Sequence, residues 1–174
     1  MDLKKIPKEY RPIPFWSWNE KLDEKETKEQ VKMMDEAGIG GFFMHARGGL
    51  QTPYMGEEWF DNVEASVHEG QKRGMRPWAY DENGWPSGFA DGLVPALGLE
   101  HQQKTLRYKI VQDDLYCENL IAAYRKTDDG FALTDTPSEG DYFIYFEVNP
   151  YYVDGFHAET IAKFLEFTHD KYYE

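Results

Sequence analysis

The sequence has little of what several functional classes require. Cys117 is the only cysteine among 174 residues, which excludes an internal disulfide framework and a zinc cluster built from the cysteines of one chain. Lys and Arg number 19 against 32 Asp and Glu, a net charge of −13, and no Lys/Arg stripe interrupts the acidic excess. Because such a surface repels phosphate backbones and acidic lipid headgroups, we expect neither nucleic acid nor a membrane as a partner.

Long apolar runs and leader sequences are also missing. No stretch approaches the roughly 18 residues of a membrane span, and the opening MDLKK lacks the apolar stretch of a signal peptide. We therefore expect a soluble, cytoplasmic protein. What the chain does have is 11 Phe, 5 Trp and 12 Tyr within a hydrophobic content of 41%. That content can supply the core of a folded domain.

Several well-known catalytic signatures are absent. The sequence contains no His-Glu-x-x-His, no Gly-x-Ser-x-Gly, no Gly-Lys-Ser/Thr after a glycine-rich loop and no Gly-x-Gly-x-x-Gly. Zinc hydrolases of that pattern, nucleophile-elbow hydrolases and the common phosphate-binding and dinucleotide-binding loops are therefore unsupported.

The hydrophobic pattern changes along the chain. Apolar runs at 12–19, 39–46 and 76–83 alternate with helical spacing at 23–37 and 57–73, which predicts βαβ units on a parallel sheet. Asp23 followed by Glu26 predicts the start of the first helix. Short alternating segments at 106–112, 120–126, 131–133 and 142–148 predict antiparallel strands, and helical spacing returns from Ile161 towards the C-terminus.

Polar and aromatic residues follow each of the three expected parallel strands. Function gathers at the carboxyl ends of such strands, and this mixture can hydrogen-bond hydroxyls and stack on the apolar faces of sugars. The candidate site residues are Trp18, Asn19, His45, Arg47, Asp81, Glu82, Asn83 and Trp85.

Each candidate also has a structural interpretation. One residue of the Trp16 and Trp18 pair is expected to face the core, and His45 fits a hydrogen-bonded core histidine. Arg47 could simply pair with a carboxylate. Since Asp81 and Glu82 are neighbours on a strand, at most one is expected to enter a pocket while the other braces a loop.

Three motifs resemble a known family. PFWSWN (14–19), AGIGGFFMHARGGL (37–50) and YDENGWPSG (80–88) resemble the start of the catalytic barrel of bacterial glycoside hydrolases of the family 106 α-L-rhamnosidase type, and NPYYVD (149–154) and THDKYY (168–173) extend the resemblance. The resemblance implies an α/β fold, a partial (β/α)8 TIM-type barrel. Its first βα units would span 10–98, an inserted antiparallel β subdomain 99–148, and the return to the barrel, with a C-terminal helix, 149–174.

The resemblance also implies a chemistry. It implies inverting hydrolysis of α-L-rhamnosides or related glycans by two carboxylates, with calcium near the site. Asp81 and Glu82 become the candidate catalytic or metal-binding carboxylates, and the other candidates become substrate-binding. We further expect the chain to be the amino-terminal piece of such an enzyme, with a principal catalytic acid beyond Glu174 and an open sheet edge that favours self-association.

Two alternatives remain open. The chain could be a non-catalytic carbohydrate-binding or truncated, inactive fragment. It could also belong to a different barrel enzyme, such as a lyase or epimerase, with His45 as the base.

Overall fold

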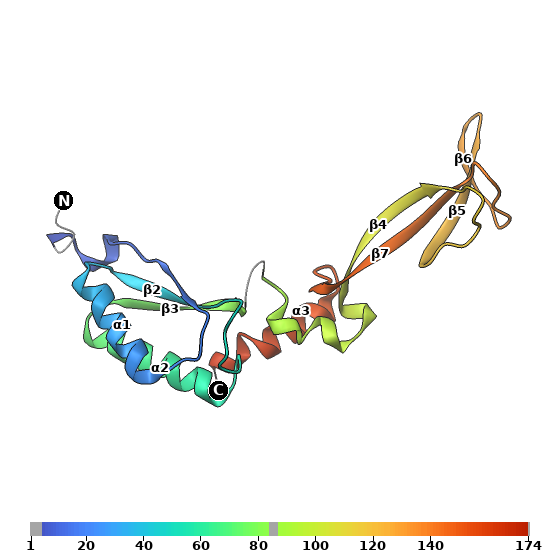
Figure 1. Ribbon diagram of the computed structural model, residues 1–174. Coiled ribbons are helices and arrows are strands. Elements are labelled where there is room, and N and C mark those ends of the chain that lie inside the picture. Colours follow the sequence, from blue (N-terminus) through green and yellow to red (C-terminus); the bar gives the residue numbers. More distant parts are fainter. Residues whose placement is uncertain (1–4, 84–86, 174) are drawn as a thin grey trace. The chain divides into compact units, whose positions relative to one another are not determined.

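The computed structural model describes residues 5–83 and 87–173 and divides into two compact units (Figure 1). Unit 1 comprises Met1–Val94 and Ile161–Glu174, and unit 2 comprises Pro95–Thr160. Unit 1 contains a three-stranded parallel sheet of order β1-β2-β3, and unit 2 contains a four-stranded antiparallel sheet of order β4-β7-β5-β6. The units are described separately below.

The elements follow the chain in the order of their labels, where η marks a short 3-10 turn. Unit 1 contains η2 (Lys8–Tyr10), β1 (Phe15–Trp18), α1 (Glu24–Glu36), β2 (Gly41–Ala46), α2 (Glu57–Lys72), β3 (Arg76–Asn83), η3 (Ala90–Gly92) and η6 (Asp170–Tyr172). Unit 2 contains η4 (Pro95–Leu97), η5 (Leu99–His101), β4 (Gln102–Ile110), β5 (Leu120–Thr127), β6 (Gly130–Leu133) and β7 (Tyr142–Val153). Helix α3 (Ala158–Phe167) begins in unit 2 and ends in unit 1.

The architecture contradicts the expected partial (β/α)8 barrel. The three parallel strands form an open sheet whose two helices, α1 and α2, lie on the same face (Figure 1). The next four strands pair antiparallel with one another in a separate sheet. A barrel of this type closes with eight parallel strands. The strand and helix rhythm is common to open sheets and barrels, so the sequence pattern alone could not separate them.

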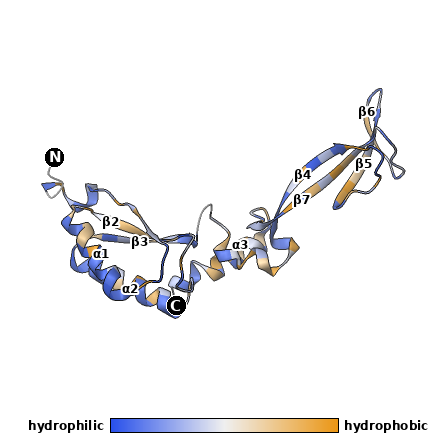
Figure 2. Cartoon of the chain, in the orientation of Figure 1, coloured by the Kyte–Doolittle hydropathy of each residue, from blue (hydrophilic) through white to orange (hydrophobic). Residues whose placement is uncertain are grey.

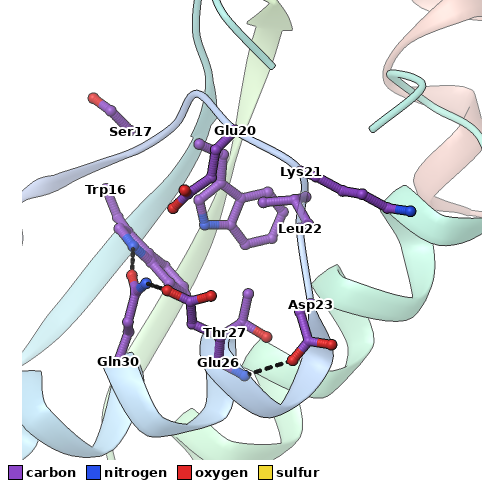
Figure 3. Close-up of a pocket in the computed structure, with 10 residues that line it drawn as sticks. Trp16, Ser17, Glu20, Lys21, Leu22, Asp23, Glu26, Thr27 and Gln30 are labelled. Carbon is purple, nitrogen blue, oxygen red and sulfur yellow. Dashed lines mark hydrogen bonds between the residues drawn. The ribbon is translucent and has the colours of Figure 1, made fainter. Parts of the chain in front are cut away.

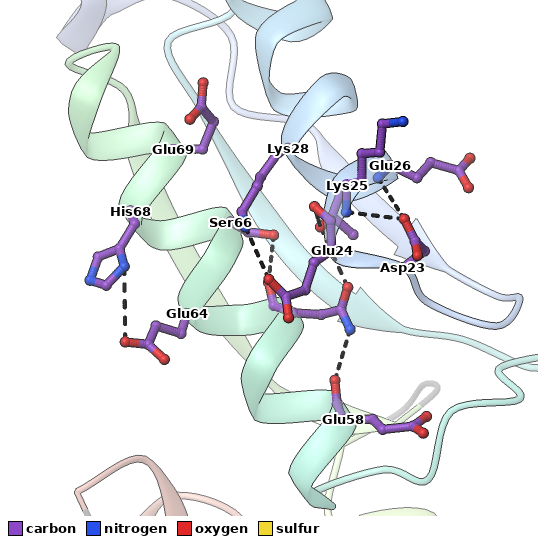
Figure 4. Close-up of polar contacts among 12 residues, drawn as sticks. Asp23, Glu24, Lys25, Glu26, Lys28, Glu58, Glu64, Ser66, His68 and Glu69 are labelled. Carbon is purple, nitrogen blue, oxygen red and sulfur yellow. Dashed lines mark hydrogen bonds and ion pairs between the residues drawn. The ribbon is translucent and has the colours of Figure 1, made fainter.

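Helix α1 begins where the sequence predicts. The Asp23 side chain accepts hydrogen bonds from the backbone N–H groups of Lys25 and Glu26, both at 3.0 Å (Figure 4). This cap satisfies amide groups that the first turn of a helix leaves unpaired. Val31 is fully buried against the sheet, whereas Lys28 forms an exposed ion pair with Glu24. Helix α1 is therefore amphipathic, as its spacing predicts.

Polar side chains connect α1 to α2. The hydroxyl of buried Thr27 lies 3.4 Å from the side-chain oxygen of Asn62, whose amide donates to the Glu58 carbonyl at 2.8 Å. The Ser66 hydroxyl donates to the Asn62 carbonyl at 2.7 Å (Figure 4). Because buried polar atoms are costly without partners, this network allows the two helices to pack closely beside the sheet.

The core of unit 1 lies between the sheet and its helices. Phe42 and Met44 of β2 are buried there, and Figure 2 shows β2 as a hydrophobic strand. Trp18 of β1 and Trp59 of α2 meet edge to face with ring centroids 5.0 Å apart. Aromatic pairs in this geometry add to the stabilisation by burial.

Two glycines at the start of β2 are required by close backbone approach. A Cβ added to Gly41 would lie 2.1 Å from the carbonyl oxygen of Arg76 on β3, and one added to Gly40 would lie 2.2 Å from the carbonyl oxygen of Lys8. The glycine pair, which is unusual in a buried strand, thus allows β3 and the N-terminal segment to pack against β2.

Unit 2 has its core on one face of the antiparallel sheet. Val111, Ala123 and Phe143 are buried together there, with Cys117 packed against them. Strand β7 continues beyond the expected limit at 148 to Val153, which pairs with Gln102 of β4. The segment 149–154, expected to return to a barrel, instead extends this sheet to Val153.

A buried carboxylate closes the loop before β7. Asp141 is 4% exposed and accepts hydrogen bonds from both Nε and Nη2 of Arg125, at 3.0 and 2.7 Å. The backbone N–H of Ser138 also donates to it, at 2.9 Å. The Arg125 guanidinium and this N–H hold the pKa of the Asp141 carboxyl down at about 2.

Within the described residues, none of the helices combines the length and apolar composition needed to cross a bilayer.

We predict that Gly41→Ala destabilises unit 1. The added methyl group clashes with the β3 backbone, and overpacking of this kind costs about 2 kcal/mol of unfolding free energy. Urea unfolding followed by tryptophan fluorescence measures the loss. Gly48→Ala is the matched control, since nothing lies within 4 Å of a Cβ at Gly48. Equal stability of the two variants would contradict the close approach.

We predict that Asp141→Asn removes an acid-dependent part of the stability of unit 2. A carboxyl whose folded pKa is depressed to about 2 stabilises the fold above its unfolded pKa, roughly 4, and this contribution disappears as the pH falls towards 2. Thermal unfolding by circular dichroism between pH 6 and pH 2 tests this. The wild-type chain is expected to lose its advantage over the variant across that interval, and an exposed-site control, Asp135→Asn, is expected to follow the wild type.

Candidate functional site

The three parallel strands end side by side at one edge of the sheet. In the register of the sheet, Trp18 of β1 is paired with Ala46 of β2, and Ala46 is paired with Asn83 of β3. A register shift between Met44 and Ala46 leaves extra residues on β3 near its end. A bulge of this kind redirects side chains near functional sites. We call these strand ends, together with residues 87–91, the rim.

Glu82 organises the rim from within. Its carboxylate is fully buried and accepts four backbone hydrogen bonds, from Asn83, Gly88, Phe89 and Ala90, at 2.5 to 2.9 Å. Burial raises the pKa of the Glu82 carboxyl, and the four N–H donors oppose that rise. Both oxygens are occupied by these donors. Glu82 therefore holds the segment after β3 and does not face a ligand.

The backbone is strained at Ala90 and Asp91, in the segment whose N–H groups Glu82 binds. Ala90 and Asp91 have φ values of 49° and 55°, in the left-handed region that residues other than glycine seldom adopt. The N–H of Ala90 is one of the four that Glu82 accepts. Such strain persists only where surrounding contacts enforce it, and it is concentrated at functional sites.

Asp91 is the carboxylate that this strained turn presents. Its side chain accepts a hydrogen bond from the Asn83 amide at 2.8 Å. Burial raises the pKa of the Asp91 carboxyl. Sequence reasoning missed Asp91, although the Asp91-Gly92 dipeptide is a turn signal that could have directed attention to it.

Asp81 lies beside Glu82 but has different surroundings. It is half-buried, and its carboxylate accepts one hydrogen bond from the Ser87 hydroxyl at 3.1 Å. Of the two neighbouring carboxylates, Asp81 thus retains capacity to accept further hydrogen bonds. The pair divides as strand alternation requires, with one carboxylate turned to the loop backbone and the other left accessible.

Aromatic rings line the face of the sheet opposite to the helices. His45 and Tyr80 have ring centroids 4.2 Å apart, and Phe15 lies 5.4 Å from each of them. Phe43 stacks between Phe15, at 5.3 Å, and Trp78, at 5.9 Å. We call these five residues the aromatic row. His45 is 4% exposed and is held within the row.

Trp18 lies on the other face, in the core. It is 2% exposed, so its ring is not accessible for stacking on a sugar. The hollow beside it, lined by Trp16 and Trp18 (Figure 3), has a volume of about 20 Å³, which is enough for one water molecule. The Trp16 N–H donates to Gln30 at 2.8 Å. The expectation that only one of the two indoles faces the core is wrong: residues two apart on a strand share a face, and both indoles point towards the helices, with Trp18 buried and Trp16 partly buried.

The remaining predicted residues lie at different strand ends of the rim. Asn19 follows β1 and Arg47 follows β2, and both are exposed. The backbone N–H of Arg47 donates to the backbone carbonyl of Trp18 at 3.0 Å. Asn83 is half-buried and contacts Asp91. Trp85 lies outside the described residues.

The described residues do not assemble a metal site. No group of three or more His, Cys, Asp or Glu side chains among 5–83 and 87–173 is arranged to hold an ion. Calcium requires several oxygen ligands, and the oxygens of Glu82 are already taken by backbone donors. These residues do not fit the expected calcium ion, and we assign it no role.

Comparison with known proteins shows a partial likeness to a solved structure. No protein-family model matches the chain, and no curated protein matches it. A solved structure of a rhamnosidase from Novosphingobium sp. PP1Y is similar over 69% of this chain, with a TM-score of 0.49 and 22% sequence identity. The chain corresponds to 12% of the length of that protein.

We predict that Glu82→Gln destabilises unit 1 by about 2 kcal/mol, because an amide cannot accept the four N–H groups as a carboxylate does. All five tryptophans lie in unit 1, so tryptophan fluorescence during urea unfolding measures its stability. Hydrogen exchange at Gly88, Phe89 and Ala90 is expected to accelerate. Asp81→Asn is the matched control and is expected to leave both readouts close to wild type. Equal effects of the two variants would refute the division of roles.

Proposed function

We propose that the chain is part of a carbohydrate-active protein of the glycoside hydrolase type, with unit 1 supplying part of its sugar-binding site. One observation carries the proposal. At the end of the parallel sheet, the half-buried Tyr80 of β3, whose ring packs against buried His45, is followed on the same strand by Asp81 and Asn83, and the Asn83 amide contacts Asp91. Ring faces pack against the apolar faces of a sugar, while carboxylates and amides bind its hydroxyls.

The substrate class comes from the sequence motifs. The segments 14–19, 37–50 and 80–88 resemble those of family 106 α-L-rhamnosidases. Rhamnosides or related glycans are therefore the substrates to test first. The acidic balance of the chain, with a net charge of −13, agrees with an uncharged substrate rather than a phosphorylated one.

The geometry suggests a role for each carboxylate. Inverting glycoside hydrolysis uses one carboxylic acid to protonate the leaving oxygen and one carboxylate to activate water. Asp91 is the candidate proton donor, because the left-handed turn holds it beside Asn83 and its pKa is raised, and Asp81 suits the binding of sugar hydroxyls. Glu82 acts through the segment it holds and is a positioning residue.

We predict that the chain binds L-rhamnose or a related monosaccharide and that Asp81→Ala weakens this binding at least about tenfold. The change removes a charged hydrogen-bond acceptor, which is worth roughly 1.5–3 kcal/mol. Isothermal titration, with and without calcium, measures the affinity. Asp61→Ala, which removes an exposed carboxylate from α2, is the control.

A second assay separates catalysis from binding. Release of aryl alcohol from an aryl α-L-rhamnoside, lost in Asp91→Asn, supports a hydrolase. Binding without turnover supports the non-catalytic carbohydrate-binding alternative. Affinity that is unchanged by Asp81→Ala would remove the rim from the proposal.

A further inference from the structure

The antiparallel sheet of unit 2 has one face that its own core does not use. Its buried cluster, Val111, Ala123 and Phe143, lies on one side. On the opposite side a hollow of about 470 Å³ is lined by Tyr108, Tyr124, Phe131, Tyr142 and Ile144. We call these five residues the tyrosine hollow. Its volume lies within the range of ligand pockets, roughly 300–1,000 Å³.

The register of the strands places these side chains on one face. Tyr108 of β4 is paired with Ile144 of β7, and Tyr124 of β5 is paired with Tyr142 of β7. Partners in an antiparallel sheet point to the same side. All four strands contribute, since Phe131 comes from β6. The hollow therefore belongs to unit 2 alone and forms when its sheet forms.

The aromatic rings of the tyrosine hollow are inclined to one another. Phe131 and Tyr142 stand at 90° to each other with centroids 5.1 Å apart, and Tyr108 lies 6.4 Å from Tyr142 at 38°. Tyr108 is 69% exposed and Phe131 is 61% exposed. Exposed rings at an angle offer a flat apolar surface with a second ring beside it. Tyrosine adds a hydroxyl at the margin that can donate or accept a hydrogen bond.

Charge discriminates between possible occupants. The five lining residues are uncharged, whereas residues 95–160 carry 12 Asp and Glu against 5 Lys and Arg. A second copy of the chain would bring a like charge to this face, and nucleic acid or an anionic ligand would be repelled. A neutral ligand with both apolar faces and hydroxyl groups meets no such repulsion.

We propose that the tyrosine hollow is a second saccharide-binding site, which holds a neutral mono- or disaccharide by ring stacking. The choice of saccharides rests on the proposed function, but the site is separate from the rim and lies in unit 2. Its role is to bind glycan, and no bond is made or broken there.

The test is isothermal titration of the full chain and four variants with neutral mono- and disaccharides, L-rhamnose included. Tyr108→Ala and Phe131→Ala are expected to weaken binding at the hollow roughly fivefold or more, because each removes an exposed stacking ring. Tyr116→Ala removes a tyrosine of unit 2 that is 70% exposed but does not line the hollow. It is expected to leave binding unchanged. Asp81→Ala reports on the rim in unit 1.

The outcomes separate the two proposals. A binding event lost in Tyr108→Ala and Phe131→Ala but retained in Asp81→Ala supports the hollow. Binding that depends on Asp81 alone overturns the hollow and leaves the proposed function standing. Binding that depends on the tyrosine hollow alone shows that the rim of unit 1 does not bind saccharide. Absence of any saccharide binding overturns the proposal for the tyrosine hollow. Self-association in light scattering that Tyr108→Glu abolishes also overturns it and identifies this face as an interface between copies of the chain.

Discussion

The buried carboxylate of Glu82 is the constraint on which the candidate site depends. Four backbone N–H groups converge on it from the end of β3 and from the segment that follows. Bringing a carboxylate out of water is costly, and it is tolerated here because each oxygen receives donors. The consequence reaches beyond Glu82 itself. The segment is drawn back against its own strand, and the left-handed turn at Ala90 and Asp91 is enforced.

Both units use the two faces of a sheet for different purposes. In unit 1 the helix-facing side of the sheet carries Phe42 and Met44, while the other side carries the aromatic row. In unit 2 one side carries Phe143 and the other carries the tyrosine hollow. Alternation of side chains along a strand makes such a division possible. When one face of a sheet packs in the core, aromatic rings on the other face are left available for ligands. Both saccharide-binding proposals rest on such rings.

Much of the local structure followed from sequence patterns. Asp23 was predicted as a helix cap and caps α1, and the strand ending at Asn83 was predicted with its observed limits. The closure of the sheet was predicted wrongly, since a strand and helix rhythm describes neighbours in the chain and not the number of strands that complete a sheet. Asp81 and Glu82 were singled out together, but their separate surroundings depend on residues up to eight positions away. Asp91 was missed because its presentation requires a backbone conformation that its residue type does not announce.

The sequence by itself determined the order and the approximate places of the helices and strands, which faces are apolar, the acidic charge and the kinds of side chain that follow each parallel strand. These properties depend on residues close together in the chain, so they can be predicted from residue spacing and composition. Tertiary structure decided how deeply each indole is buried, which carboxylate accepts the backbone N–H groups and which rings meet across strands. Those outcomes depend on contacts between distant segments, such as Trp18 with Trp59 and Tyr108 with Tyr142. Such contacts are fixed only when the sheets and helices pack, because burial and hydrogen bonding are then shared among all of them.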